Sequence, residues 1–95
     1  MSGFKPLDPL LHSQLRLAIV SLLLGVDSAE FTFIKEKTQA TAGNLSVQLD
    51  KLSEAGYITT KKAFKGKKPV TTCKITRKGI EAFETYVNAL KGYIN

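Results

Sequence analysis

The sequence is poor in the residues that build covalent and metal cross-links. Its 95 residues include one cysteine, Cys73, one histidine, His12, and no tryptophan. A single cysteine excludes an internal disulfide framework and a cysteine-rich metal site. We therefore expect no metal ligands and no cofactor, and the scarcity of cysteine fits a reducing compartment, for which we expect the cytoplasm.

Long apolar runs are also missing. The longest apolar-rich window, Leu15–Val26, is too short and too interrupted to span a bilayer. The run Leu22–Leu24 lies inside a periodic helix and no signal-peptide cleavage site follows it. We therefore expect neither a membrane partner nor a signal peptide.

The residue groupings that support catalysis are not found either. The sequence has no glycine-rich phosphate loop, no paired carboxylates at a plausible site and no metal-ligand spacing. Cys73 and His12 could in principle form a nucleophile and its base. They fall in different predicted elements, however, and Cys73 suits a small inward-facing residue of a strand. We expect no catalytic residues and no enzyme activity.

Positive charge, by contrast, is concentrated in one window. The net charge is +6, and eight of the basic residues lie between Lys61 and Lys78, with no acid among them. The other 77 residues sum to −2. Such a local patch attracts a polyanion. The alternative is a solvated face that only aids solubility.

Hydrophobic spacing and capping residues predict four helices and a hairpin. The expected elements, in chain order, are a loose arm over 1–7, a helix over 9–24 started by Asp8-Pro9, a one-residue strand at Phe31, a helix over 32–38 capped by Thr32, a helix over 41–55 capped by Thr41, strands over 57–64 and 70–75 around a turn over 65–69, and a C-terminal helical segment over 77–95 capped by Thr76. This order, α-(β)-α-α-β-β-α, predicts one mainly α domain over 1–95 with a small β-hairpin. That arrangement is a winged helix-turn-helix.

The helix over 41–55 carries the predicted recognition face. Leu45, Leu49 and Leu52 repeat at helical spacing and must face the core, which leaves a small, polar face outside. Such a face suits a helix that enters a DNA major groove about 12 Å wide. The residues that we expect to contact DNA from this helix are Thr41, Asn44, Ser46, Val47, Gln48 and Lys51.

Individual roles follow from side-chain chemistry. Asn44 and Gln48 each carry the donor and acceptor that can read adenine N6 and N7, and Val47 could contact a thymine methyl group. Thr41 and Ser46 suit phosphate oxygens. The alternative for Thr41 is a role as helix cap only, and Asn44 and Gln48 could be ordinary surface residues.

Lysines load the tip of the predicted hairpin, which is the wing. Lys65, Lys67 and Lys68 should reach flanking phosphates or the minor groove, where lysine adds affinity and little base selectivity. Arg77 opens the last helix, where a cation opposes the helix dipole. This unfavourable position favours a further phosphate contact for Arg77.

The first and last helices carry more apolar surface than one small core needs. The first has two apolar stripes, and a helix that is apolar nearly all round is usually buried on more than one side. Another subunit would cover the second side most easily, so we expect a homodimer, with a central helix in a monomer core as the alternative. The candidate dimer contacts are Leu10, Leu17, Val20, Leu24, Tyr86, Leu90, Tyr93 and Ile94.

Two segments on either side of the basic wing, GNLSVQLDKLSEAGYI and ITRKGIEAFETYV, resemble the small MarR-like winged-helix transcriptional regulators. The resemblance covers about residues 7–90. It implies a cytoplasmic dimer that binds a pseudo-palindromic operator in double-stranded DNA, and it assigns the recognition and wing roles to the residues named above. It also implies that the first and last helices supply the dimer contact.

The chain departs from this family in two respects. It is too short for the long terminal helices that build a ligand pocket in full-length MarR-type proteins, so we do not expect a small-molecule effector, although one stays open. It also lacks the clustered cysteine and histidine ligands of metal-sensing relatives.

Two other functions stay open. A winged helix can serve as a protein-interaction scaffold, and a basic domain can bind nucleic acid without regard to sequence. The retained basic wing argues against the scaffold, and the readable face of the helix over 41–55 argues against the second function.

Overall fold

The structure, a computed structural model, describes residues 4–94. Residues 1–3 of the predicted arm and Asn95 of the predicted C-terminal segment lie outside this range. The elements are α1 (Gln14–Leu24), β1 (Ala29–Glu30), α2 (Phe31–Thr38), α3 (Ala42–Glu54), β2 (Ile58–Lys65), β3 (Lys68–Ile75) and α4 (Arg77–Ile94). Their order confirms the predicted winged helix-turn-helix.

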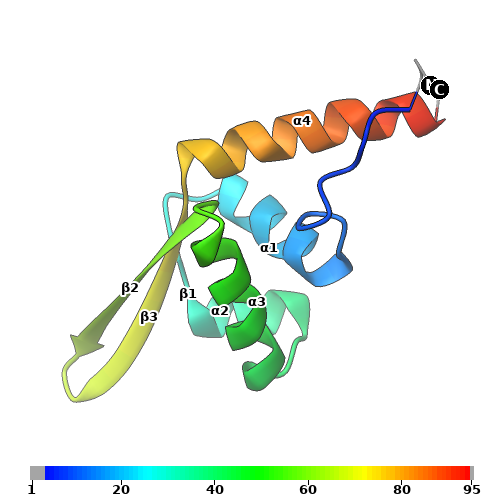
Figure 1. Cartoon of the computed structure of the whole chain (residues 1–95). Helices are drawn as coiled ribbons and strands as arrows, with labels where there is room; N and C mark the ends of the chain where they lie inside the picture. Colours follow the sequence, from blue (N-terminus) through cyan, green and yellow to red (C-terminus); the bar gives the residue numbers. More distant parts are fainter. Residues whose placement is uncertain (1–3, 95) are drawn as a thin grey trace.

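The β-hairpin and the last helix extend in different directions from one corner of a small helical body, where β3 leads into α4 (Figure 1). The three strands form one antiparallel sheet in the order β1-β3-β2. Within residues 4–94, strand β1 pairs only with the half of β3 that lies away from the hairpin tip, at Ala29↔Cys73 and Glu30↔Thr72. The remainder of the β2–β3 ribbon therefore projects beyond the body as the wing, and α4 starts at the base of this ribbon.

Helix α1 begins five residues later than Asp8-Pro9 predicts. Asp8 caps a turn instead, because its Oδ1 accepts a hydrogen bond from the Leu10 backbone N–H at 2.9 Å. Ser13 is the cap of α1, and its hydroxyl accepts from the Arg16 N–H at 3.4 Å. The turn carries Leu11 into the core, where it is fully buried. Its burial explains why the second capping residue, and not the first, starts the helix.

The entry to α2 also differs from the prediction. The short strand is Ala29–Glu30, so Phe31 is the first residue of the helix and Thr32 lies within its first turn rather than at its cap. Glu30 holds the cap position without a side-chain hydrogen bond. Pairing of Ala29 with Cys73 across the sheet fixes where the strand ends.

Helix α3 follows its sequence signals closely. The Thr41 hydroxyl accepts from the Asn44 N–H at 3.2 Å, as an N-cap should. At the other end Gly56 adopts a φ of 79°, in the left-handed region that glycine enters without steric cost. Both predicted ends of this helix are confirmed.

The wing is longer and its turn tighter than predicted. Lys65 pairs with Lys68, which leaves a turn of only Gly66 and Lys67, with Gly66 at a φ of 64°. Pro69 is thus part of β3, opposite Phe64. It is tolerated because this part of β3 lies beyond the end of β1, where no strand needs its missing N–H.

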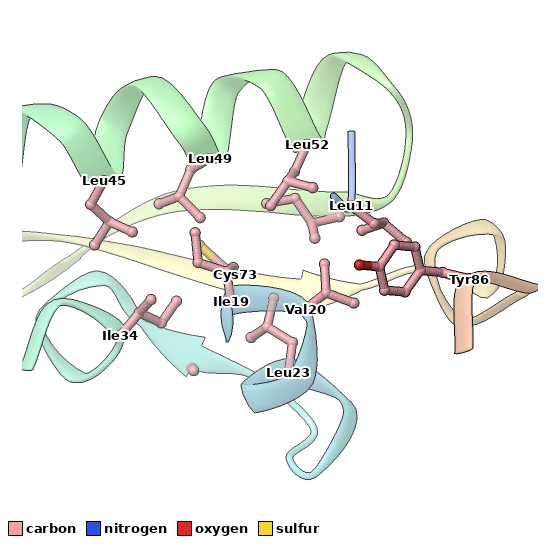
Figure 2. Packing of buried hydrophobic residues seen from close by; sticks show 12 residues of the cluster. Leu11, Ile19, Val20, Leu23, Ile34, Leu45, Leu49, Leu52, Cys73 and Tyr86 are labelled. Atoms are coloured by element: carbon pink, nitrogen blue, oxygen red, sulfur yellow. The ribbon is translucent and has the colours of Figure 1, made fainter. Parts of the chain in front are cut away.

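The core lies between α1, α3 and the sheet (Figure 2). Leu45, Leu49 and Leu52 of α3 point toward α1, and all three are almost completely buried. Because this face of α3 is held inside, its opposite face is turned to solvent. Among residues 4–94, no helix is both long enough and apolar enough to pass through a lipid bilayer.

Candidate nucleic-acid interface

The outer face of α3 presents short and polar side chains. Thr41, Asn44, Ser46, Val47 and Lys51 are all exposed. Val47 is 50% exposed, which leaves its side chain accessible to a contact outside the chain. The sixth predicted residue of this face, Gln48, is half-buried.

Gln48 is half-buried because it contacts α1. Arg16 Nη1 donates a hydrogen bond to Gln48 Oε1 at 2.5 Å, and Gln48 Nε2 donates to Asn44 Oδ1 at 3.0 Å. Arg16 is also bound through Nε to the Leu10 carbonyl oxygen at 2.6 Å. Arg16 was not predicted from the sequence to belong to this surface, although it is the one charged residue of α1.

The wing lysines are exposed, but they are not equivalent. Lys65 Nζ forms an ion pair with Glu30 Oε2 at 3.0 Å, which ties the wing to the end of β1 and partly neutralises that charge. Within residues 4–94, Lys67 and Lys68 form no salt bridge. These two lysines therefore carry the uncompensated charge at the tip.

The free wing tip and the start of α3 lie at the same end of the molecule (Figure 1). Residues 41–48 of α3 and residues 66–68 of the wing are thus displayed together. Arg77 is not part of this surface. It follows the base of the hairpin, where Ile58 pairs with Ile75, and its Nε lies 3.4 Å from Glu81 Oε1 in an exposed pair.

The eight candidate dimer contacts fall into three groups. Val20 and Tyr86 are 0% and 5% exposed, so the structure corrects their assignment: they belong to the core and do not face outward. Packing on two sides within one chain accounts for the apolar character of α1 at Val20. Half-buried Leu10, Leu17 and Leu90 pack against the same core, and only Leu24, Tyr93 and Ile94 are exposed.

The end of α4 is covered in part by the chain's own N-terminal segment. The rings of Phe4 and Tyr93 meet edge to face with centroids 5.1 Å apart, and Tyr93 Oη donates to the Lys5 carbonyl oxygen at 2.8 Å. Figure 1 shows this segment running along the last turns of α4. The described part of the predicted loose arm is therefore packed.

Cys73 and His12 lie in different surroundings, one in the core and the other at the surface. Cys73 is fully buried, and burial raises the pKa of its thiol to about 11. The exposed His12 is hydrogen-bonded through Nδ1 to Tyr86 Oη at 3.0 Å. Across residues 4–94, no three His, Cys, Asp or Glu side chains converge as a metal site would require.

Comparison with known proteins gives the same fold. The family model described as a winged helix DNA-binding domain matches residues 15–94. An uncharacterized protein of Methanocaldococcus jannaschii is 42% identical over 76 residues, covering 80% of this chain and 83% of the relative. The structure of a transcriptional regulator homologue from Pyrococcus horikoshii OT3 superposes with a TM-score of 0.82 at 30% identity, covering 90% of this chain and 84% of that one.

More distant structures share the fold alone. A MarR mutant from E. coli, solved in complex with operator DNA, has a TM-score of 0.72 at 18% identity. The match covers 86% of this chain and 58% of the MarR chain. The winged-helix fold implied by the resemblance to MarR-like regulators is thereby confirmed.

Proposed function

The chain belongs to the winged helix DNA-binding domain family, and from that premise we propose that it is a homodimeric transcriptional regulator that binds specific sequences in double-stranded DNA. In this proposal α3 enters the major groove with Thr41, Asn44, Ser46, Val47, Gln48 and Lys51 toward the DNA. The wing lysines Lys65, Lys67 and Lys68 contact flanking phosphates or the minor groove.

The observation that carries the proposal is the shared orientation of two unlike surfaces. The polar start of α3 and the cationic tip of the wing are displayed at one end of the molecule (Figure 1). A readable helix supplies base contacts, whereas lysines beside it supply affinity for phosphate. Neither a scaffold nor a solubilising face requires the two surfaces to lie together.

The dimer is proposed on the exposed apolar residues Leu24, Tyr93 and Ile94, of which Ile94 is 75% exposed. A second copy related by twofold symmetry would cover them and would present two α3 helices to inverted half-sites. Such a protein binds a pseudo-palindromic operator. We expect it to act in the cytoplasm without a small-molecule effector.

Sequence selection from a random duplex pool at near-physiological salt tests the proposal. We expect an enriched motif of two inverted half-sites about one helical turn apart. A single half-site would refute the dimer and keep DNA recognition. Retention without any enriched motif would refute sequence specificity and favour the sequence-independent alternative.

Salt dependence tests the role of the wing separately. Each phosphate contact adds about 0.9 to the slope of log affinity against log salt, so replacing Lys67 and Lys68 by Ala should flatten the slope by about 1.8 per protomer. Affinity for all duplexes should fall alike. The matched control replaces Lys5 and Lys91 by Ala. This removes the same number of positive charges near the far end of α4 and should leave the slope unchanged.

A further inference from the structure

The hydrogen bonds between α1 and α3 bear on which base the protein reads. We propose that Arg16 is a positioning residue that fixes the side-chain amide of Asn44, through Gln48, so that Asn44 turns N–H donors toward the groove and reads guanine. This inference rests on the proposed function and specifies the chemistry of the same surface.

Arg16 is held at two points before any DNA is bound. Its Nε donates to the Leu10 carbonyl oxygen at 2.6 Å and its Nη1 to Gln48 Oε1 at 2.5 Å. The guanidinium is half-buried between the turn before α1 and the middle of α3. A planar group bonded through two of its nitrogens has little freedom to rotate. Its direction toward Gln48 is thus set by the packing of α1.

Arg16 determines the direction of the hydrogen bonds that link it to Gln48 and Asn44, that is, which atom donates and which accepts. A guanidinium only donates, so the atom of Gln48 that faces it is the carbonyl oxygen Oε1. The amide nitrogen Nε2 of Gln48 then points the other way and donates to Asn44 Oδ1 at 3.0 Å. Arg16, the first member of this series of hydrogen bonds, therefore determines which way the oxygen and the nitrogen of both side-chain amides point.

This arrangement leaves Asn44 with an unequal pair of polar atoms. Its Oδ1 is engaged by Gln48, whereas its Nδ2 donates to no atom within residues 4–94. Asn44 is exposed, so the two N–H groups of Nδ2 are available to a ligand. An asparagine that reads adenine must turn both its donor and its acceptor toward the base, because adenine offers N6–H and N7 side by side. Asn44 Oδ1 keeps a second lone pair, but its bond from Gln48 holds the oxygen toward residue 48.

Guanine fits the available atoms better. Its major-groove edge offers O6 and N7, which are both acceptors. An Asn44 that holds Oδ1 toward Gln48 and turns Nδ2 toward the groove matches that edge, whereas adenine would need the same Oδ1 for its N6–H. The arrangement thus favours guanine over adenine at the position read by Asn44, in place of the adenine expected from the composition of the side chain alone.

A variant that exchanges the donor and acceptor roles between residues 48 and 44 provides a sharp test. In Gln48→Glu the carboxylate still accepts from Arg16, but it can only accept from Asn44 as well. Asn44 must then turn its Nδ2 toward residue 48 and its Oδ1 outward. Selection from a random pool should move the preferred base at that position from guanine to adenine or cytosine, which both offer an exocyclic N–H.

Asn44→Ala identifies the position, because it should lose selectivity there alone. Arg16→Met removes the donor while keeping most of the side-chain volume, and it should relax selectivity at that position by about 10-fold, the equivalent of one lost hydrogen bond. Arg16→Lys keeps a charged donor and should restore part of the guanine preference. The same base enriched by the wild type and Gln48→Glu, or adenine enriched by the wild type, would overturn the proposal.

A measurement without DNA separates this inference from the proposed function. The side-chain NH₂ resonances of Asn44 and Gln48 should both shift in Arg16→Met, although Asn44 is hydrogen-bonded to Gln48 and not to Arg16. Unchanged Asn44 resonances would refute the positioning role even if the protein binds an operator. Shifted resonances in a protein that selects no motif would refute the proposed function and the guanine assignment, while the hydrogen-bonded chain would stand.

Discussion

Substitution of Gly79 by Ala should destabilise the protein, although alanine is the better helix former. Gly79 lies in the first turn of α4, where the helix passes directly over the start of β2. A Cβ atom at this position would lie 2.2 Å from the Tyr57 carbonyl oxygen and 3.0 Å from Ile75 Cγ1. The same carbonyl accepts the Thr76 N–H at 3.0 Å, so it cannot move away without loosening the junction between β3 and α4.

The magnitude follows from opposing contributions. Gly→Ala inside a helix gains about 0.8–1 kcal/mol of intrinsic helix stability. Forcing a methyl group into a packed site costs about 1–3 kcal/mol, and loss of the backbone hydrogen bond adds about 0.5–1.5 kcal/mol. We expect a net loss of about 1–3 kcal/mol. For a domain of this size each kcal/mol lowers Tm by about 4–8 °C.

Gly43→Ala is the matched control, because Gly43 is also helical and a Cβ there meets no atom within 4 Å. We expect this variant to gain about 0.5–1 kcal/mol. The free energies of unfolding of both variants and of the wild type are compared by urea unfolding, monitored by far-UV circular dichroism. Equal stability of the two variants would contradict the close approach of α4 to Tyr57.

Three further predictions concern buried groups. Leu52→Ala should cost about 2–5 kcal/mol of stability, because Leu52 is fully buried, whereas Val47→Ala on the exposed face should change it by less than about 0.5 kcal/mol in urea unfolding. Cys73, with its thiol pKa raised to about 11 by burial, should react with a disulfide reagent at mildly alkaline pH only after unfolding, and a fast reaction of the native protein would count against its burial. Burial first, and then the hydrogen bond to Asp8 and its charge, raises the pKa of Tyr57 to about 12. The stability from the protonated phenol is therefore fully present below about pH 10 and is lost as pH rises through 12. Absorbance titration should show one tyrosine that ionises at higher pH than the others, and in Asp8→Asn this tyrosine should ionise at a lower pH than in the wild type.

Prediction from sequence succeeded where several local signals agree. The N-cap Thr41, the spacing of Leu45, Leu49 and Leu52, and Gly56 after the last turn all specify the same helix α3. No other part of the chain needs to be known for these signals to act. Agreement among levels of this kind is what makes a segment predictable.

Prediction failed where local signals compete. Asp8-Pro9 and Ser13 are both good helix starts, and the choice between them depends on burial of Leu11 against other elements. The wing turn is a similar case. Lysines and Pro69 suggested a turn over residues 65–69, but the strand register continues to the Lys65–Lys68 pair, and Gly66 permits the tighter turn. Packing and pairing across the sheet decide such cases.

Some features of the candidate site are likewise determined by local sequence, and others by residues that are distant in the chain. Exposure of the α3 face and the charge of the wing follow from helical period and composition, so these two features were predictable. What their atoms are free to bind was not, because the partner of Gln48 is Arg16, 32 residues earlier in the chain. No spacing rule joins these positions; the packing of α1 on α3 does. Under the proposed function, affinity for phosphate would thus be encoded locally in the lysines of the wing, whereas the choice of base would depend on the tertiary fold through the guanidinium of Arg16, which can only donate.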